Sequence, residues 1–394
     1  MSNARWILTE HVGAEGFAAM QDDWRRLTSE MPDPAIWHSH EAYAAYIANL
    51  CPDPAAFRCL ALSDGQRTRA ILPLEERLDR GLYEGGRGVR MRVLGMPWRK
   101  ENWALTDAIG PEDDARRMLL PAAIAYLRRQ PDRPAILALG RSRETSALWD
   151  GLASMSPLTW YAFNDVNEFV VSTAMPPAEF EARLSRNSRQ MLRRAARRYG
   201  AFSGTGSVRA VTPEELADEF ERFLDVEASG WKGAHGSAIR QAPGEEGFYR
   251  DLVRLISLDG RCEIHSLYAE GRCIASGLWV FTRHQAVLLK CGYDESYAHA
   301  SPGRLLTHRS LLLCCADPEI GSVSLLGDAP WLRHWSPVSN SLQRAYVALR
   351  PFTGTAYLAA LRLRYGPVRL VLRALKQRRA RRAGGVRAPG HESE

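Results

Sequence analysis

The sequence predicts a mixed α/β (α+β) fold of two tandem halves, each a mixed, largely antiparallel sheet flanked by helices, followed by a basic C-terminal helical tail. Three observations lead to this prediction. Helix-period and strand-period segments alternate, short turn signals join apolar runs into hairpins, and both halves repeat the order helices, hairpin, strand, helix, strand. The 394 residues are sufficient for two domains of roughly 100–200 residues each. We therefore divide the chain into residues 1–165, 166–352 and 353–394.

The first half is predicted to place helices and strands around one hairpin. The run FRCLALSDGQRTRAILPLEERLD has two apolar stretches about Asp64-Gly65, which is the strongest short-range hairpin signal. Ser39 is positioned to cap a helix at residues 36–50, with Glu41 in its first turn. The other predicted elements are strands at 6–12, 90–96 and 135–141 and helices at 14–31 and 115–130.

The second half is predicted to contain a meander of strands. The segments CEIHSLYAEG, RCIASGLWVFTR and HQAVLLKCGYD follow one another with short turns between them. A polar loop, ESYAHASPG, then leads into an apolar helix. The other predicted elements are strands at 167–175, 207–212 and 322–328, helices at 186–199, 213–233, 247–260 and 304–319, an aromatic loop at 329–337 and a closing segment at 341–351.

Composition and cysteine content bound the class of protein. The chain is 45% hydrophobic and 25% charged, as in ordinary globular proteins, and no apolar run approaches the ~18–20 residues of a membrane span. The N-terminal stretch lacks the basic-then-apolar order of a signal peptide. Seven cysteines without a CxxC pair argue against a disulfide framework and against structural zinc. We therefore expect a reduced, cytoplasmic protein without a metal site.

Positive charge is concentrated at the C-terminus. Residues 361–394 hold ten Arg or Lys and two Glu, a net charge of +8, whereas the rest of the chain has a net charge of −1. Because nucleic-acid-binding domains usually carry positive charge on the folded body, we expect no DNA partner. A short basic helix is predicted after Gly366-Pro367, with an apolar face formed by Val368, Val371, Leu372 and Leu375. Either this helix lies on the acidic inner face of the membrane, or the tail is solvated.

The order of elements in the second half resembles the core of the GNAT acyltransferases. The local sequence motifs resemble those of the acetyltransferase family associated with cellulose and exopolysaccharide biosynthesis (the CelD/BcsL branch), a relative of the Fem aminoacyl transferases. The landmarks stand in family order: RLSRNSRQMLRRAARR, GWKGAHGSAI, GYDESYAHASPGRLL and LLGDAPWLRHW, preceded in the first half by WHSHEAYAAYI, AILPLEERLDRG and VLGMPW. The resemblance covers most of residues 5–350 and implies two GNAT-like halves, of which the second retains the acyl-donor elements.

The segment SPGRLL is the predicted donor site. GNAT enzymes hold the pyrophosphate of acetyl-CoA or another acyl-CoA on backbone N–H groups where a glycine-containing loop opens a helix, because free amides and the helix dipole both favour an anion there. The resemblance also implies that the end of the preceding strand admits the pantetheine arm. An ordinary capped helix is the alternative interpretation of the same residues. The candidate donor-binding residues are Ser301, Pro302, Gly303, Arg304, Leu305 and Lys290.

Catalytic and acceptor-binding candidates gather around two loops. Asp328 and His334 offer a carboxylate and an imidazole beside the indoles of Trp331 and Trp335, which suits a general base next to a sugar-stacking platform. A turn aspartate and a structural histidine are the alternative interpretation. The family's Tyr-Lys pair is replaced by Leu332-Arg333, so a titratable amine is lost there. The further candidates are Lys232 and Tyr293 for catalysis, and Trp231 and Arg333 for acceptor binding.

The helix of residues 186–199 has six arginines and no acid. Its apolar residues fall within about 100° of one another, so the helix is predicted to dock one face on a core. Part of its charge, at Arg186, Arg189 and Arg193, is predicted to bind donor phosphates or a pyrophosphate-linked acceptor. The alternative is a solvated face paired with Glu179 and Glu181.

These observations favour an acyl-CoA-dependent N- or O-acyltransferase that modifies a polysaccharide precursor or another cell-envelope intermediate by direct transfer in a ternary complex. The expected acceptor is a small molecule or a glycan precursor. One alternative is a Fem-like transferase that uses an aminoacyl-tRNA donor. Another is a non-catalytic binding or regulatory component of an envelope-synthesis complex.

Overall fold

The computed structural model describes residues 6–79, 91–97, 107–111 and 114–366. The elements of the first half are β1 (Ile7–Val12), α1 (Gly13–Ala19), α2 (Gln21–Glu30), η1 (Ile36–His38), α3 (His40–Asn49), η2 (Pro54–Ala56), β2 (Arg58–Ser63), β3 (Thr68–Asp79), β4 (Met91–Gly95), α4 (Asp114–Arg129), β5 (Ile136–Arg143), α5 (Ala147–Ala153) and η3 (Pro157–Thr159). The predicted hairpin is confirmed as β2 and β3. The helix predicted at 14–31 is divided into α1 and α2 at Met20.

The second half begins on the long strand β6 and contains the predicted meander as β8, β9 and β10. Its elements are β6 (Trp160–Ser172), α6 (Pro177–Arg183), α7 (Arg186–Gly200), β7 (Gly206–Ala210), α8 (Pro213–Ser229), α9 (Trp231–Ala234), η4 (Ile239–Gln241), α10 (Glu245–Ser257), β8 (Cys262–Ala269), β9 (Arg272–Phe281), β10 (Gln285–Tyr293), η5 (Glu295–Ala300), α11 (Pro302–Ala316), β11 (Ser322–Ser324), η6 (Pro330–Trp335), β12 (Val338–Ala348) and α12 (Pro351–Tyr365).

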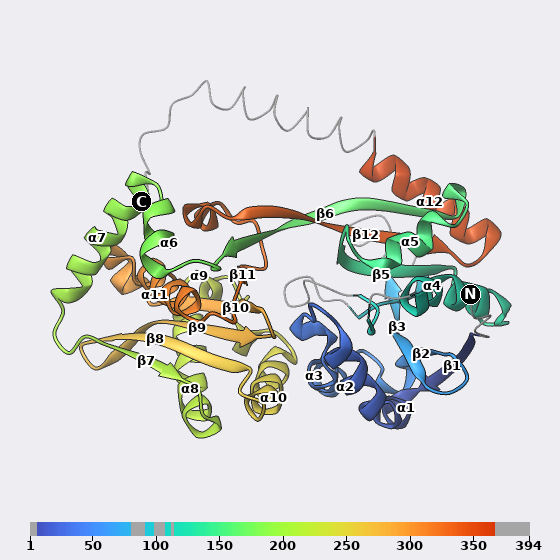
Figure 1. Ribbon diagram of the computed structural model, residues 1–394, viewed down its shortest axis with the longest axis horizontal. Coiled ribbons are helices and arrows are strands. Elements are labelled where there is room, and N and C mark those ends of the chain that lie inside the picture. Colours follow the sequence, from blue (N-terminus) through green and yellow to red (C-terminus); the bar gives the residue numbers. More distant parts are fainter. Residues whose placement is uncertain (1–5, 80–90, 98–106, 112–113, 367–394) are drawn as a thin grey trace.

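The two halves share one sheet, which corrects the expectation of a separate sheet in each half. The described strands form a single 12-stranded sheet in the order β1-β2-β3-β4-β5-β12-β6-β11-β10-β9-β8-β7. At the seam, β12 pairs with β5 of the first half, and β6 pairs with β11 of the second. The long antiparallel β6–β12 ribbon therefore joins the halves (Figure 1). The strand β12, at the far end of the second half, thus pairs with β5 of the first half, and no local pattern in the sequence predicts this pairing.

Both halves contain the same local arrangement next to the seam. In each, an antiparallel meander ends on a strand that pairs in parallel with the strand after the next helix: β4 with β5, and β10 with β11. Both parallel pairs are three residues long. The echo between the halves predicted from the sequence is thus confirmed as a pseudo-symmetric sheet. The boundary at residue 165/166 stays a prediction, and β6 runs across it.

Helices cover both faces of the sheet, and one core spans the two halves. Aromatic and aliphatic side chains of α1, α2 and α3 pack in the same buried cluster as those of α8 and α10. Asn49 on α3 donates to Asp251 on α10 at 2.8 Å, and Gly244 and Gly247 permit this approach because a Cβ at either would meet Asn49 within 2.4 Å. The opposite face is covered by α4 and α5 in the first half and by α6, α7 and α11 in the second.

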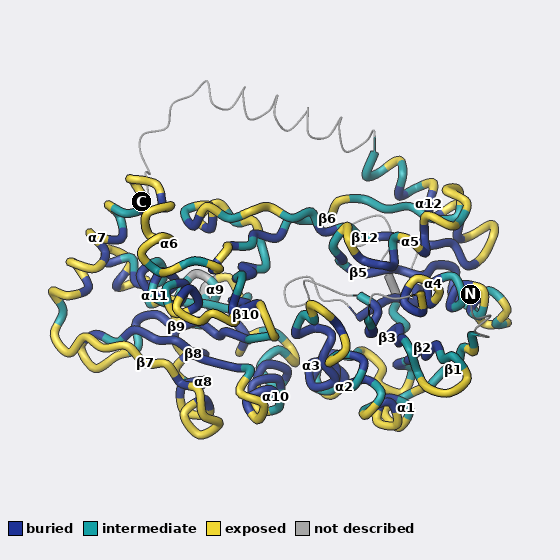
Figure 2. Tube along the Cα trace, viewed as in Figure 1, coloured by how far each residue is buried: buried dark blue, intermediate teal, exposed yellow. Residues whose placement is uncertain are grey.

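The last described helix, α12, was not predicted. The sequence assigned residues from 353 onward to the basic tail, but residues 351–365 form a helix that packs on the β6–β12 ribbon (Figures 1 and 2). Tyr357, Leu358 and Leu361 are buried against Val93, Ile136 and other residues of the first half. The predicted basic helix at 368–375 lies outside the described residues. Among the described helices, none has the length and apolarity needed to cross a membrane.

Candidate active site

The strands β10 and β11 separate after a short parallel pairing. They pair from Gln285↔Ser322 to Val287↔Ser324. Beyond this point, β10 continues to Tyr293 beside β9, with a bulge between Leu288 and Lys290. The chain after β11 follows β6 instead, since Leu325 N–H donates to Phe169 at 2.9 Å. The two segments therefore diverge near the middle of the sheet.

The N-terminus of α11 lies at the end of the diverging β10 segment. Ser301 adopts a left-handed conformation (φ 50°) and Pro302 occupies the first helical position, two residues before the predicted start of this helix. A Cβ at Gly303 would lie 3.2 Å from Cδ1 of Tyr293, so the tyrosine ring rests on this glycine. Since the N–H groups in the first turn have no partner within the helix, this terminus favours an anion.

Two of the predicted donor-binding residues have defined local roles. The N–H of Leu305 donates to the Ser301 carbonyl at 3.1 Å, and its side chain is buried with Ala195 and Tyr199. Leu305 therefore serves the helix rather than a ligand, which corrects that prediction. Arg304 lies in the first turn of α11, as a donor-binding residue there must. Its side chain is half-buried, and burial lowers the pKa of its guanidinium.

The equivalent place in the first half is occupied by a side chain. A Cβ at Gly95, at the end of β4, would lie 3.1 Å from both terminal nitrogens of Arg77. Arg77 donates to the Met96 carbonyl at 3.2 Å and to the buried carboxylate of Glu75 at 3.4 Å. The Arg77 guanidinium thus covers the end of β4 in the first half. Among the described residues, no charged side chain is placed in this way over the β10–β11 pair of the second half.

Lys290 and Tyr293 lie on opposite faces of β10. Lys290 Nζ is 5.6 Å from the ring centroid of Tyr249 on α10, whereas Tyr293 contacts Gly303 of α11. This is the alternation expected for a strand. Lys290 thus faces the helices α8 and α10, and Tyr293 faces the donor-side helix α11.

Lys232 is held in place by protein groups. Its Nζ lies 3.0 Å from the buried Glu227 carboxylate and donates to the Cys291 carbonyl at 2.9 Å. The other oxygen of Glu227 accepts from the Ile239 N–H at 2.9 Å. Lys232 therefore ties α8 and α9 to β10, and its predicted catalytic role stays a prediction. The side chain of Trp231 lies outside the described residues.

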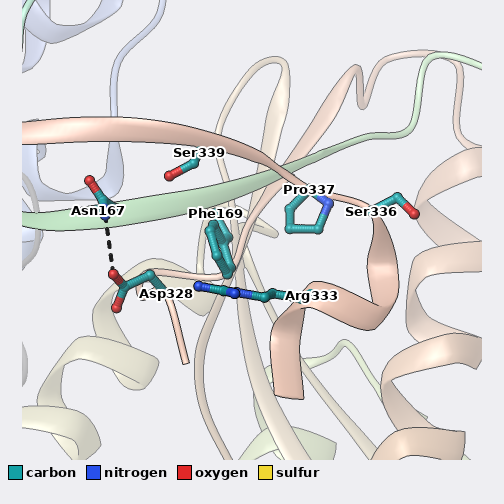
Figure 3. Close-up of a pocket in the computed structure, with 7 residues that line it drawn as sticks. All are labelled: Asn167, Phe169, Asp328, Arg333, Ser336, Pro337 and Ser339. Atoms are coloured by element: carbon teal, nitrogen blue, oxygen red, sulfur yellow. Dashed lines mark hydrogen bonds between the residues drawn. The ribbon is translucent and has the colours of Figure 1, made fainter. Parts of the chain in front are cut away.

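Asp328 and Arg333 meet in one pocket. A cavity of about 340 Å³ lies between the seam ribbon and η6 (Figure 3). Asn167 donates to the Asp328 carboxylate at 3.2 Å, and the guanidinium of Arg333 extends toward Asp328 (Figure 3). The lining residues are Asn167, Phe169, Asp328, Arg333, Ser336, Pro337 and Ser339. The structure thus places a carboxylate, an amide and a guanidinium, which are groups that bind hydroxyls, on one wall.

The two tryptophans of η6 have different environments. Trp331 is 46% exposed and is not among the residues that line the pocket. Trp335 is 2% exposed and stacks on the His308 ring, with centroids 6.2 Å apart. Its predicted role in sugar stacking is therefore wrong for the folded chain, because the indole fills the core.

His334 lies between α7 and α11. Its carbonyl accepts from the Ser188 hydroxyl at 3.3 Å. Burial, and then the positive charge of Arg304, lower the pKa of the His334 imidazole below its usual value. These effects favour the uncharged imidazole, which is the form that can accept a proton.

The arginine helix is confirmed as amphipathic. Leu192, Ala195 and Tyr199 are buried, and the helix begins at the predicted cap, with Ser185 accepting from Ser188 N–H at 3.0 Å. Arg186 and Arg193 are exposed and make no ion pair among the described residues.

Arg189 turns back onto the preceding helix. It donates to the carbonyls of Ala182 and Leu184 at 2.7 and 2.8 Å, so it closes the end of α6 rather than facing a pocket. In the alternative interpretation α7 pairs with Glu179 and Glu181, but the structure places these acids beside Arg183 and His308 instead.

One buried cluster at the seam was missed from the sequence. Glu168 on β6 has no exposed surface and accepts from the Ser324 hydroxyl at 2.6 Å, where β11 ends. Arg143 at the end of β5 also donates to it. The available signal was a glutamate in the apolar strand NEFVV, a position that a half-buried strand turns inward.

The fold and this site define the class of the protein. An antiparallel meander, a helix that opens on a glycine, and a parallel strand that separates from its neighbour form the layout of the GNAT acyltransferases. Residues 186–332 match the protein family described as "Acetyltransferase (GNAT) domain". The second half therefore carries a GNAT acetyltransferase domain, and the chain is an enzyme.

Solved structures share the architecture of both halves. FemX is similar with a TM-score of 0.57 at 8% identity, over 86% of this chain and 98% of that chain. The C-terminal domain of a putative lysylphosphatidylglycerol synthetase from Agrobacterium fabrum has a TM-score of 0.54 at 13% identity, over 87% and 96%. A protein of unknown function from Bacteroides thetaiotaomicron has a TM-score of 0.50 at 12% identity, over 84% and 97%. No curated protein matches the chain. At these identities the likeness concerns the fold alone.

Proposed function

We propose that the chain is an acyl-CoA-dependent N- or O-acyltransferase that acts on a polysaccharide precursor or another cell-envelope intermediate. The observation that carries the proposal is the separation of β10 from β11 beside the glycine-containing N-terminus of α11, inside the GNAT domain. Acyl-CoA, when bound, supplies the activated acyl group as a thioester.

The N-terminus of α11 binds the donor pyrophosphate in this proposal. Gly303 leaves room for close approach, and the amides of Gly303 and Arg304 belong to the first turn, where the helix dipole favours negative charge. The Arg304 guanidinium adds a positive charge. The Tyr293 ring packs on Gly303, so it lies next to this helix terminus.

Direct transfer fits the state of the thiols. Burial raises the pKa of Cys291, on β10 itself, and raises that of Cys315 to about 11. A protonated thiol is a poor nucleophile, so these cysteines do not suit an acyl-enzyme intermediate. In direct transfer the acceptor nitrogen or oxygen would attack the thioester carbon within one ternary complex and give up its proton to a base, while the C–S bond breaks and the CoA sulfur leaves as a protonated thiol.

His334 and Asp328 are the proposed groups for proton transfer. A neutral imidazole accepts the proton of the attacking hydroxyl or amine, and Asp328, already bonded to Asn167, orients the acceptor in the pocket. The exposed indole of Trp331 offers a stacking surface for a sugar ring. Arg333 in the pocket and the exposed Arg186 and Arg193 are the proposed contacts for an acidic, pyrophosphate-linked acceptor.

Donor binding is the first test. We expect CoA and acetyl-CoA to raise the melting temperature of the chain, because a ligand that binds only the native state stabilises it. Gly303→Glu should abolish this shift, since an acid in the first turn of the helix repels phosphate. Because a Cβ at residue 303 lies 3.2 Å from the Tyr293 ring, the melting temperature of the unliganded variant is compared with that of the wild type first. Gly206→Glu is the matched control, because a Cβ there meets nothing within 4 Å.

The outcome separates the donor classes. Absence of a CoA shift in the wild-type chain would overturn the acyl-CoA proposal, and transfer from aminoacyl-tRNA would then favour the Fem-like alternative. An unchanged melting-temperature shift in Gly303→Glu would show that the donor pyrophosphate does not bind at the N-terminus of α11. The acceptor class is tested by incubating the chain with labelled acetyl-CoA and nucleotide- or lipid-linked sugars, and locating the label by mass spectrometry.

A further inference from the structure

The outer face of α12 is apolar and exposed. Phe352 is 91% exposed and Leu363 is 59% exposed. The outer stripe follows helical spacing and is formed by Phe352, Thr355, Ala356, Ala359 and Leu363, all of them exposed. The opposite side of the helix is buried through Tyr357, Leu358 and Leu361. Thus α12 is fixed to the sheet by one face and presents a second apolar face to the outside (Figures 1 and 2).

A neighbouring loop extends the apolar stripe. Arg362 donates to the carbonyls of Pro157 and Trp160 at 2.8 and 2.9 Å, which fixes η3 against the end of α12. Leu158 in η3 is 71% exposed. One helix and the loop bonded to it thus expose three large apolar side chains, and a contiguous exposed apolar surface is typical of an interaction site.

The charged residues of α12 itself are all of one sign. The sequence of α12 contains no acid, and Arg350, Arg362 and Arg364 stand at its ends. The chain that continues from Gly366 holds eight Arg or Lys and two Glu. A second copy of this face would bring like charges together, whereas an anionic surface complements them.

We propose that α12 docks on the surface of an anionic phospholipid bilayer, with Phe352 and Leu363 inserted below the headgroups. An exposed apolar stripe flanked by arginines is the arrangement by which interfacial helices bind such membranes, and each basic residue near the surface adds to the attraction. The docking does not depend on the transferase activity proposed above, and it holds the enzyme beside any lipid-linked acceptor.

Vesicle binding tests the proposal with the full chain. We expect co-sedimentation with vesicles of phosphatidylglycerol and phosphatidylcholine in equal parts, and little with phosphatidylcholine alone. The double variant Phe352→Ser/Leu363→Ser keeps every charge and should bind roughly a hundredfold more weakly, because burying each of these side chains accounts for about a factor of ten. The matched control is Leu258→Ser/Val211→Ser, which removes exposed apolar side chains elsewhere and should bind as wild type.

Three outcomes would overturn the proposal. Wild-type chain that does not sediment with anionic vesicles has no such docking. Equal binding by the Phe352/Leu363 variant and the wild type would assign the attraction to charge alone and remove α12 from the contact. If the wild-type chain were a dimer in sedimentation velocity and the double variant a monomer, the stripe would be an interface between copies of the chain.

Discussion

Arg143 at the end of β5 donates two hydrogen bonds to the fully buried carboxylate of Glu168 on β6, at 3.2 and 3.3 Å. This ion pair crosses the seam of the sheet, because β5 belongs to the first half and β6 leads into the second. Glu168 also accepts from Ser324, the last residue of β11. The pair therefore fixes the first half to the place where the donor-side strands diverge.

Removal of Arg143 should destabilise the chain strongly. The variant Arg143→Met leaves the Glu168 carboxylate buried without its cation, and we expect the free energy of unfolding to fall by about 3–5 kcal/mol. Denaturation in urea measures the change. The double variant Arg143→Met/Glu168→Gln should recover much of the loss, since no buried charge remains. If Arg143→Met and Arg143→Met/Glu168→Gln were equally stable, the unpaired Glu168 carboxylate would not be the cause of the loss.

His38 should make stability depend on pH. Burial, and then the charges of Arg116 and Arg143, lower the pKa of this imidazole from 6.5 to about 3. The unfolded chain takes up a proton below about pH 6.5, while the folded chain stays neutral at His38, so stability is lost as the pH falls toward 3.

The variant His38→Asn isolates this contribution. Asparagine can replace Nδ1 as the acceptor of the Ala35 N–H, which lies 2.9 Å away, but it does not titrate. Between about pH 6 and pH 4 the wild-type unfolding free energy should fall by up to ~1.4 kcal/mol per pH unit more than that of the variant. Parallel curves in urea titrations at several pH values would show that His38 takes up its proton equally in both states.

The fold was largely predictable because its signals are local. Ser39 was predicted to cap α3 and accepts from the Ala42 N–H at 3.2 Å. The helix start at Pro302 and the buried face of α7 likewise depend on residues within a few positions of one another. Capping, turn formation and helical periodicity are short-range effects, so a sequence pattern reports them directly.

The seam and part of the site were not predictable for the opposite reason. The strand β12 pairs with β5, about 200 residues earlier, and nothing in its own sequence selects that partner. Glu168 finds Ser324 across a separation of 156 residues. Trp331 and Trp335 stand in one short turn with similar neighbours, yet packing on His308 buries only the second. These features come from tertiary packing.

The pairing of Lys232 with Glu227 separates a structural role from a catalytic one. Lys232→Met leaves the 1% exposed carboxylate of Glu227 without its cation, and we expect a loss of about 3–5 kcal/mol in the free energy of unfolding. Lys232→Met/Glu227→Gln should regain most of the stability and, with it, the acyltransfer rate. A double variant that is stable but remains slow at saturating substrates would instead place the Lys232 amine in the reaction.

The pH profile of the reaction tests His334 as the base. Burial and the nearby charge of Arg304 lower the pKa of His334. On the acid limb of the profile, kcat should therefore decline at a lower pH than is usual for a histidine base. His334→Gln should lower kcat by about 10²–10⁴-fold and abolish the limb. Arg304→Gln removes the positive charge and should move the limb to higher pH, measured at saturating donor because Arg304 also belongs to the proposed donor site. The control is Arg309→Gln on the same helix, because the Arg309 guanidinium lies over the ring of Tyr199. This variant should leave the limb in place. A limb that persists in His334→Gln, or that stays in place in Arg304→Gln, would assign the proton transfer to another group.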